Sequence, residues 1–134
     1  MGGDVVAGKV ASIERCLARV REETAEGTKV LDDQTVQDAV VLNIQRACEQ
    51  AIDLATHVVS VRRLGIATDG RHAFDLLAQA SAIPPALAER MKRMVGFRNV
   101  AVHEYQRLDR AILESIIHER LGDFIEFAAA IVRA

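Results

Sequence analysis

The sequence of 134 residues has no tryptophan, one tyrosine, four phenylalanines, two prolines and two cysteines. So few aromatic residues and prolines disfavour a β-sandwich or β-barrel. Cys16 and Cys48 lack CxxC or Cys/His spacing, so we expect buried, reduced thiols in a cytoplasmic protein rather than a disulfide or a zinc site. No apolar run approaches the ~20 residues of a membrane span, and the N-terminus does not resemble a secretory signal. The chain is therefore expected to have no contact with a membrane.

Charge is nearly balanced along the chain as a whole. The net charge of -2 argues against a protein that coats nucleic acid. Basic residues nevertheless gather between positions 90 and 110: Arg90, Lys92, Arg93, Arg98, Arg107 and Arg110. Such a zone can steer a phosphate chain, although a solvated helix face explains the patch equally well when it is judged alone.

Ala, Val, Leu and Ile recur at spacings of three and four over long segments, which is typical of helices with one buried face. The pattern predicts helices over about 4–23, 33–62, 71–79, 85–95 and 109 to near the C-terminus. Asp32 or Asp33 is expected to cap the second helix, which is the longest and has no Gly or Pro. Gly96 is expected to loosen the chain after the fourth helix. We predict an all-α bundle of about five antiparallel helices around one long central helix, forming a single domain over residues 1–134.

One short stretch carries most of the chemically useful side chains. Arg98, Asn99, His103, Glu104 and the only tyrosine, Tyr105, fall within eight residues. Residues five apart on a regular helix diverge by about 140° around its axis, so Arg98 and His103 would not converge there. We therefore expect either a local break in the helix or a site completed by a second chain.

These side chains suit one kind of reaction. An imidazole can move a proton near neutral pH, and a guanidinium can stabilise charge on a phosphate. That pair favours metal-independent RNA cleavage by His103 and Arg98, with Asn99 orienting either the histidine or the phosphate by hydrogen bonds. The ligands for a metal site are too few, and no cofactor is expected. On spacing alone, capping or surface residues remain the commoner explanation of such a pair.

The stretch from Met94 to Tyr105 resembles the RX4HXY motif of HepT proteins, a branch of the HEPN domains, with Arg98, His103 and Tyr105 at the motif positions. Residues 43–59 resemble the long second helix of that family, and Phe74-Asp75-Leu76-Leu77 followed by Ile83-Pro84 resembles its middle segment. The likeness extends over about residues 36–109 in the order of the family.

The resemblance implies a toxin of a type VII toxin–antitoxin pair. Such a protein is a HEPN endoribonuclease, with tRNA as a candidate substrate, whose homodimer brings two RX4H motifs together. Arg98 and His103 would be catalytic and Asn99 would support them. The partner would be an MntA-type nucleotidyltransferase that transfers AMP to Tyr105, and the added bulk and negative charge would block RNA.

Two further residues are candidates for a supporting role. Asp53 and His57 lie four apart on the predicted central helix and are close enough to interact there. They are interpreted either as a pair that supports the Arg98/His103 cleft or its dimer contact, or as a local helix pair or a histidine at the edge of the core. The alternative function for the whole chain is a non-catalytic helical dimer that binds RNA or nucleotide and docks a nucleotidyltransferase.

Overall fold

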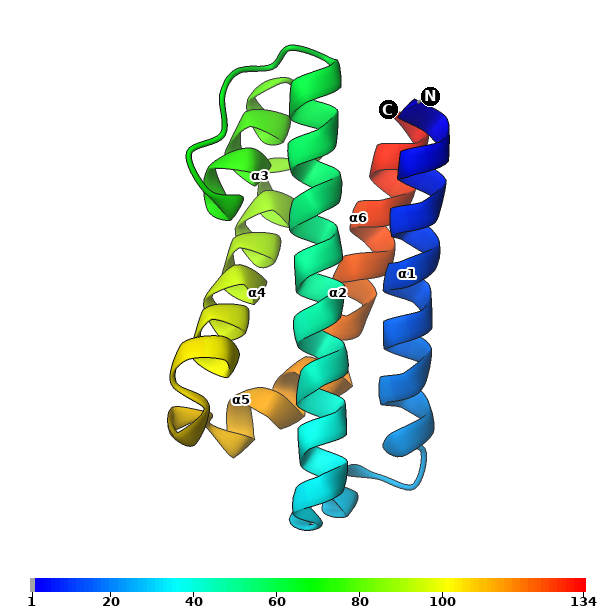
Figure 1. The fold of residues 1–134 in the computed structure, drawn as a ribbon, viewed down its shortest axis with the longest axis vertical. Helices are drawn as coiled ribbons and strands as arrows, with labels where there is room; N and C mark the ends of the chain where they lie inside the picture. The colour runs from blue at the N-terminus through cyan, green and yellow to red at the C-terminus, as the bar shows by residue number, and fades with distance from the viewer. Residues whose placement is uncertain (1) are drawn as a thin grey trace.

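A computed structural model describes residues 2–134, which form helices and turns with no strand among them (Figure 1). The α-helices are α1 (Gly2–Glu23), α2 (Gln34–Val61), α3 (Gly70–Gln79), α4 (Pro85–His103), α5 (Arg110–Ser115) and α6 (Leu121–Arg133). Short 3-10 turns cover Thr28–Asp32 and Tyr105–Arg107, and a π-helical segment, Ile116–Arg120, joins α5 to α6. The prediction of an all-α protein is confirmed.

The helices begin where the sequence supplies partners for free backbone N–H groups. The Asp33 carboxylate accepts from the N–H of Thr35 at 2.9 Å, so Asp33 rather than Asp32 caps α2. Asp109 caps α5 in the same way, accepting from the N–H of Ala111 at 2.8 Å. Pro85 occupies the first position of α4, where its missing N–H costs nothing.

Helix α2 lies at the centre of the bundle, with α1 and α6 on one side and α3 and α4 on the other (Figure 1). Consecutive long helices run in opposite directions, and the two termini lie side by side (Figure 1). The core contains fully buried side chains from five helices, and Phe74 of α3 meets Phe127 of α6 edge-to-face at 5.3 Å between ring centroids. The predicted antiparallel bundle around one long helix is confirmed.

The predicted end of the fourth helix at about residue 95 is wrong. Helix α4 continues without interruption through Gly96 to His103. Gly96 permits a close approach instead of a break, because a Cβ atom at this position would lie 3.1 Å from Nη2 of Arg71. The proposed catalytic stretch is therefore part of a regular helix.

The C-terminal part was predicted as one helix, but the structure bends it. Helix α5 crosses the end of the bundle and α6 then returns toward the termini (Figure 1). Ile116 and Leu121, at either end of the π-helical segment, are five residues apart and both buried. A π turn, with its i to i+5 period, brings such residues to the same face. The predicted start at Asp109 agrees with its role as the cap of α5.

Candidate active site

The guanidinium of Arg98 is held between two helices. Its Nε and Nη2 donate to Oε2 of Glu49, on α2, at 3.2 and 3.1 Å, and its Nη1 donates to Oδ1 of Asn99 at 3.2 Å. Gln45, one turn earlier on α2, donates to the same Glu49 oxygen at 3.4 Å. The Arg98 side chain is 30% exposed, so it is oriented by its neighbours while part of it still faces solvent.

Arg98 and Asn99 line a polar hollow of about 300 Å³ between α2, α4 and the start of α3. Glu49 and Asp53 contribute from α2, and Arg71 contributes from α3. With Asp69, just before α3, three carboxylates and two guanidinium groups thus surround the space beside the motif arginine. The two arginines could bind a small anionic group such as a phosphate, but the carboxylates beside them would oppose it.

His103 is the last residue of α4 and is exposed. Within the part of the chain that the structure describes, its imidazole makes no hydrogen bond or ion pair. Because α4 is regular, His103 lies about 7.5 Å further along the axis than Arg98 and about 140° around it. One copy of the chain therefore does not bring the two side chains to the same point.

Tyr105 lies in the short turn after α4 and is half-buried. Its hydroxyl donates to Oδ1 of Asp38, at the start of α2, and accepts from the Gln37 amide at 3.5 Å. Burial and the hydrogen bond to Asp38 both raise the pKa of Tyr105 above its ordinary value. Asp38 accepts hydrogen bonds from Tyr105 and Gln34, and both lower its pKa below the ordinary value, the bond from Tyr105 more strongly. The tyrosine hydroxyl is thus protonated and fixed against α2.

The predicted Asp53–His57 pair does not form among the described residues. The Asp53 carboxylate instead pairs with the Lys9 ammonium at 3.3 Å and lines the Arg98 hollow. His57, one turn later, lines a different hollow with residues near both chain termini, including Ile131. Neighbouring helices decide the direction of each side chain, and they separate two residues that share one helix face. The structure does not bring His57 to the site.

Ion pairs neutralise most of the basic zone between positions 90 and 110. Four of its six members have carboxylate partners at 3.1 Å or less: Arg90 with Asp123 and Glu126, Lys92 with Asp75 and Glu89, Arg98 with Glu49, and Arg110 with Asp32 and Glu114. Arg107 makes only a long, exposed contact of 3.8 Å with Glu104. The zone therefore offers far less free positive charge than the sequence indicates.

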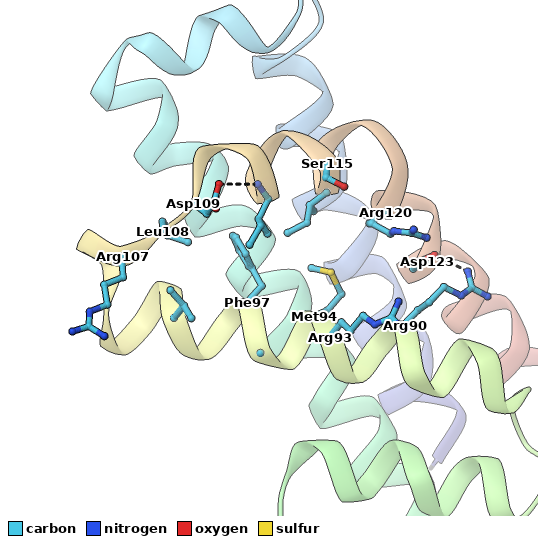
Figure 2. Close-up of a pocket in the computed structure, with 14 residues that line it drawn as sticks. Arg90, Arg93, Met94, Phe97, Arg107, Leu108, Asp109, Ser115, Arg120 and Asp123 are labelled. Atoms are coloured by element: carbon cyan, nitrogen blue, oxygen red, sulfur yellow. Dashed lines mark hydrogen bonds and ion pairs between the residues drawn. The ribbon is translucent and has the colours of Figure 1, made fainter.

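Arg93 and Arg107 lie at a second hollow, of about 410 Å³, between α4 and the segment from Arg107 to Asp123 (Figure 2). Apolar side chains such as Met94 and Phe97 form its floor, and Arg120 also lines it. Neither Arg98 nor His103 is among the lining residues. Arg93 and Arg107 carry the part of the basic zone that remains available to a polyanion.

Two acceptors near the motif were not singled out by sequence reasoning. Glu49 and Asp38 lie on α2, 49 and 67 positions from their partners Arg98 and Tyr105. No local spacing links them to the motif, because only the packing of α2 against α4 brings them together.

Among residues 2–134, no group of three or more His, Cys, Asp or Glu side chains is placed to hold a metal ion. None of the helices formed by these residues is long and apolar enough to span a membrane.

With this geometry established, comparison with known proteins defines the class. The HepT-like family, described as ribonuclease HepT-like, matches residues 12–131. The mRNA nuclease HepT of Shewanella oneidensis is 41% identical over 124 residues, which is 92% of this chain and 93% of that protein. The chain is an all-α HEPN protein and belongs to the HepT-like ribonuclease family.

Solved structures agree with this assignment. The tri-AMPylated HEPN toxin of Shewanella oneidensis, solved in complex with an MNT antitoxin, superposes with a TM-score of 0.93 at 40% identity, covering 98% of each chain. A toxin–antitoxin structure with AMP-PNP matches with a TM-score of 0.93 at 39% identity, covering 98% of this chain and 99% of the other. The bundle described above is the fold of those toxins.

Proposed function

We propose that this chain is the toxin of a type VII toxin–antitoxin pair and acts as a metal-independent endoribonuclease. Its relative is an mRNA nuclease, and its structural neighbours are toxins bound to antitoxins. The observation that carries the proposal is the motif itself: Arg98 is held by Glu49 and Asn99 beside a polar hollow, with His103 exposed at the end of the same helix.

The chemistry needs only these side chains and the RNA. The ribose 2′-oxygen attacks the adjacent phosphorus, the bond to the 5′-oxygen breaks, and a 2′,3′-cyclic phosphate and a 5′-hydroxyl result. His103 takes the proton from the 2′-hydroxyl or gives one to the leaving 5′-oxygen. Arg98 offsets the negative charge that grows on the phosphorane. Asn99 keeps the guanidinium in place through its side-chain oxygen.

The active form is proposed to be a homodimer. Helix α4 is unbroken, so the alternative of a local break that would bring Arg98 to His103 no longer applies. A second copy that supplies its own α4 across a cleft would place an Arg and a His on one phosphate. Leu42 of α2 and Val102 of α4 are large apolar side chains that are each 40% exposed, and Val102 is next to His103. Burying them would favour such a contact.

The proposed off-switch is transfer of AMP to Tyr105 by an MntA-type nucleotidyltransferase. One relative of known structure is tri-AMPylated and bound to an MNT antitoxin. Tyr105 is two residues from His103, so an attached AMP adds bulk and a negative phosphodiester close to the proton-transfer group. Repulsion between this phosphodiester and the RNA backbone blocks binding.

We also propose that residues 1–134 act as one domain in the cytoplasm. One cluster of buried residues extends from Ile13 to Ile131, which supports a single folding unit. Cys16 and Cys48 are free and buried. This is the state expected of thiols in a reducing compartment, where mRNA is also found.

The test is cleavage of a defined RNA by the purified full-length chain in the presence of EDTA. We expect the wild type to cut, and Arg98→Ala and His103→Ala to lose about 100-fold or more of the rate. Arg93→Ala serves as the control, because it removes an arginine of α4 outside the Arg98 hollow and should lower RNA affinity more than the maximal rate. Full activity of both motif variants would refute the assigned site.

A different result would support the alternative function. If RNA binds tightly but remains intact across many sequences, the chain is a binding module and not a nuclease. Intact mass after incubation with the nucleotidyltransferase and ATP tests the switch. Wild type should gain AMP, and Tyr105→Phe should not.

A further inference from the structure

The side chain of Tyr105 is set in a small polar cluster on α2. Asp38 accepts the hydrogen bond of its hydroxyl, and Gln37 donates to the same hydroxyl oxygen at 3.5 Å. Gln34, one turn before Asp38, donates to Oδ1 of Asp38 at 2.7 Å and so fixes the carboxylate. The phenol thus has a defined proton acceptor on one of its sides, supplied by its own chain.

A phenol in this setting needs such an acceptor if it is to act as a nucleophile. Burial and Asp38 raise the pKa of Tyr105, so the hydroxyl keeps its proton at neutral pH. As the oxygen bonds to phosphorus it becomes far more acidic, and its proton must leave during the reaction. A base already in hydrogen-bond contact takes that proton without any rearrangement.

We propose that Asp38 is the general base for AMP transfer to Tyr105, and that Gln34 and Gln37 position the carboxylate and the phenol. This inference rests on the proposed function, in which Tyr105 receives AMP. It assigns part of the catalytic apparatus for the modification to the toxin. The nucleotidyltransferase supplies the bound nucleoside triphosphate.

The Tyr105 oxygen attacks the α-phosphorus of ATP and forms a phosphodiester bond, while the bond from that phosphorus to the bridging oxygen of the β-phosphate breaks. Pyrophosphate leaves with the electron pair of this bond. The phenolic proton passes to Oδ1 of Asp38 and from there to water, because Asp38 is exposed. No oxidant or reductant is needed.

Attachment of AMP also changes the contact between Tyr105 and Asp38. Once its oxygen carries AMP, Tyr105 can no longer donate to Asp38, and a negative phosphodiester faces a carboxylate. The contact that held the side chain against α2 becomes repulsive. The modified tyrosine therefore leaves α2, which frees the AMP to occupy the space around His103.

The experiment measures AMP incorporation into the full-length chain by the nucleotidyltransferase of the same genome, with ATP and magnesium, at several toxin concentrations. Asp38→Asn keeps the size of the side chain and its acceptor oxygen but removes the base. We expect kcat to fall about 100-fold with KM for the toxin nearly unchanged. Asp38→Glu should recover about tenfold of this loss. Asp32→Asn, which removes another exposed carboxylate near the start of α2, should behave like wild type.

The outcomes separate this inference from the function on which it rests. An unchanged kcat for Asp38→Asn would overturn the role of Asp38 while leaving Tyr105 as the target. A rise in KM alone would also overturn it, because Asp38 would then be a docking contact. If wild type gains no AMP, or if Tyr105→Phe still gains it, the proposed switch itself fails.

Discussion

Replacing Glu49 by glutamine tests whether the motif arginine has to be held in place. The variant keeps the length of the side chain but removes the charge that receives two guanidinium N–H groups at 3.1 and 3.2 Å. Both partners are about one-third exposed, so the ion pair should contribute only about 1 kcal/mol to the free energy of unfolding. A large change in activity would therefore not reflect loss of the fold.

Two effects on RNA cleavage oppose each other and can be measured separately. A freed Arg98 samples several rotamers, and loss of alignment at a reacting phosphate costs about 10- to 100-fold in kcat. The negative charge of Glu49 also repels the RNA backbone. At about 4 Å in water, its removal is worth about 1 kcal/mol, or about fivefold tighter RNA binding at low salt. We therefore expect a lower kcat together with an equal or lower KM.

The assay is single-turnover cleavage over a range of RNA concentrations, at low and at moderate salt. Asp75→Asn is the matched control, because it breaks an ion pair of similar exposure, with Lys92 at 2.9 Å, outside the Arg98 hollow. The fivefold gain in affinity should shrink as salt rises, since screening weakens exposed charges. An unchanged kcat for Glu49→Gln, or an equal loss for Asp75→Asn, would refute the orienting role of Glu49.

Three further outcomes follow from individual side chains. Tyr105, the only tyrosine, should ionise at higher pH in native than in urea-unfolded protein when followed by ultraviolet absorbance, and Asp38→Asn should lower its pKa in the native protein. The contacts of the protonated hydroxyl stabilise the fold below the ordinary pKa of 10.0, and this stabilisation is lost as the pH rises through the raised pKa of the native protein. Cys48, whose burial raises its thiol pKa and whose Sγ donates to the Met94 carbonyl, should resist alkylation until the protein unfolds, as mass spectrometry would show. Phe74→Ala should lower the free energy of unfolding by about 3–5 kcal/mol in chemical denaturation, because it empties a fully buried site packed on Phe127.

Much of the fold followed from periodicity because helix spacing is a local property. Apolar residues three and four apart predict which face of each segment is buried, and short polar side chains predict where helices begin. The errors came where a second element decides the outcome. Gly96 was expected to end a helix, but its missing Cβ makes room for Arg71 of α3. The bend at Ile116–Arg120 depends on tertiary packing, because the apolar residues on either side of it must both reach the core.

The sequence alone determined the class of fold and the motif that marks the family, because both are written in residues close together along the chain. Arg98, His103 and Tyr105 could be found by reading eight positions. Tertiary structure decided the surroundings on which their chemistry depends. Packing of α2 against α4 pairs Arg98 with Glu49, and Tyr105 is set against Asp38 on the same helix. These contacts join residues dozens of positions apart, and no local pattern in the chain encodes them.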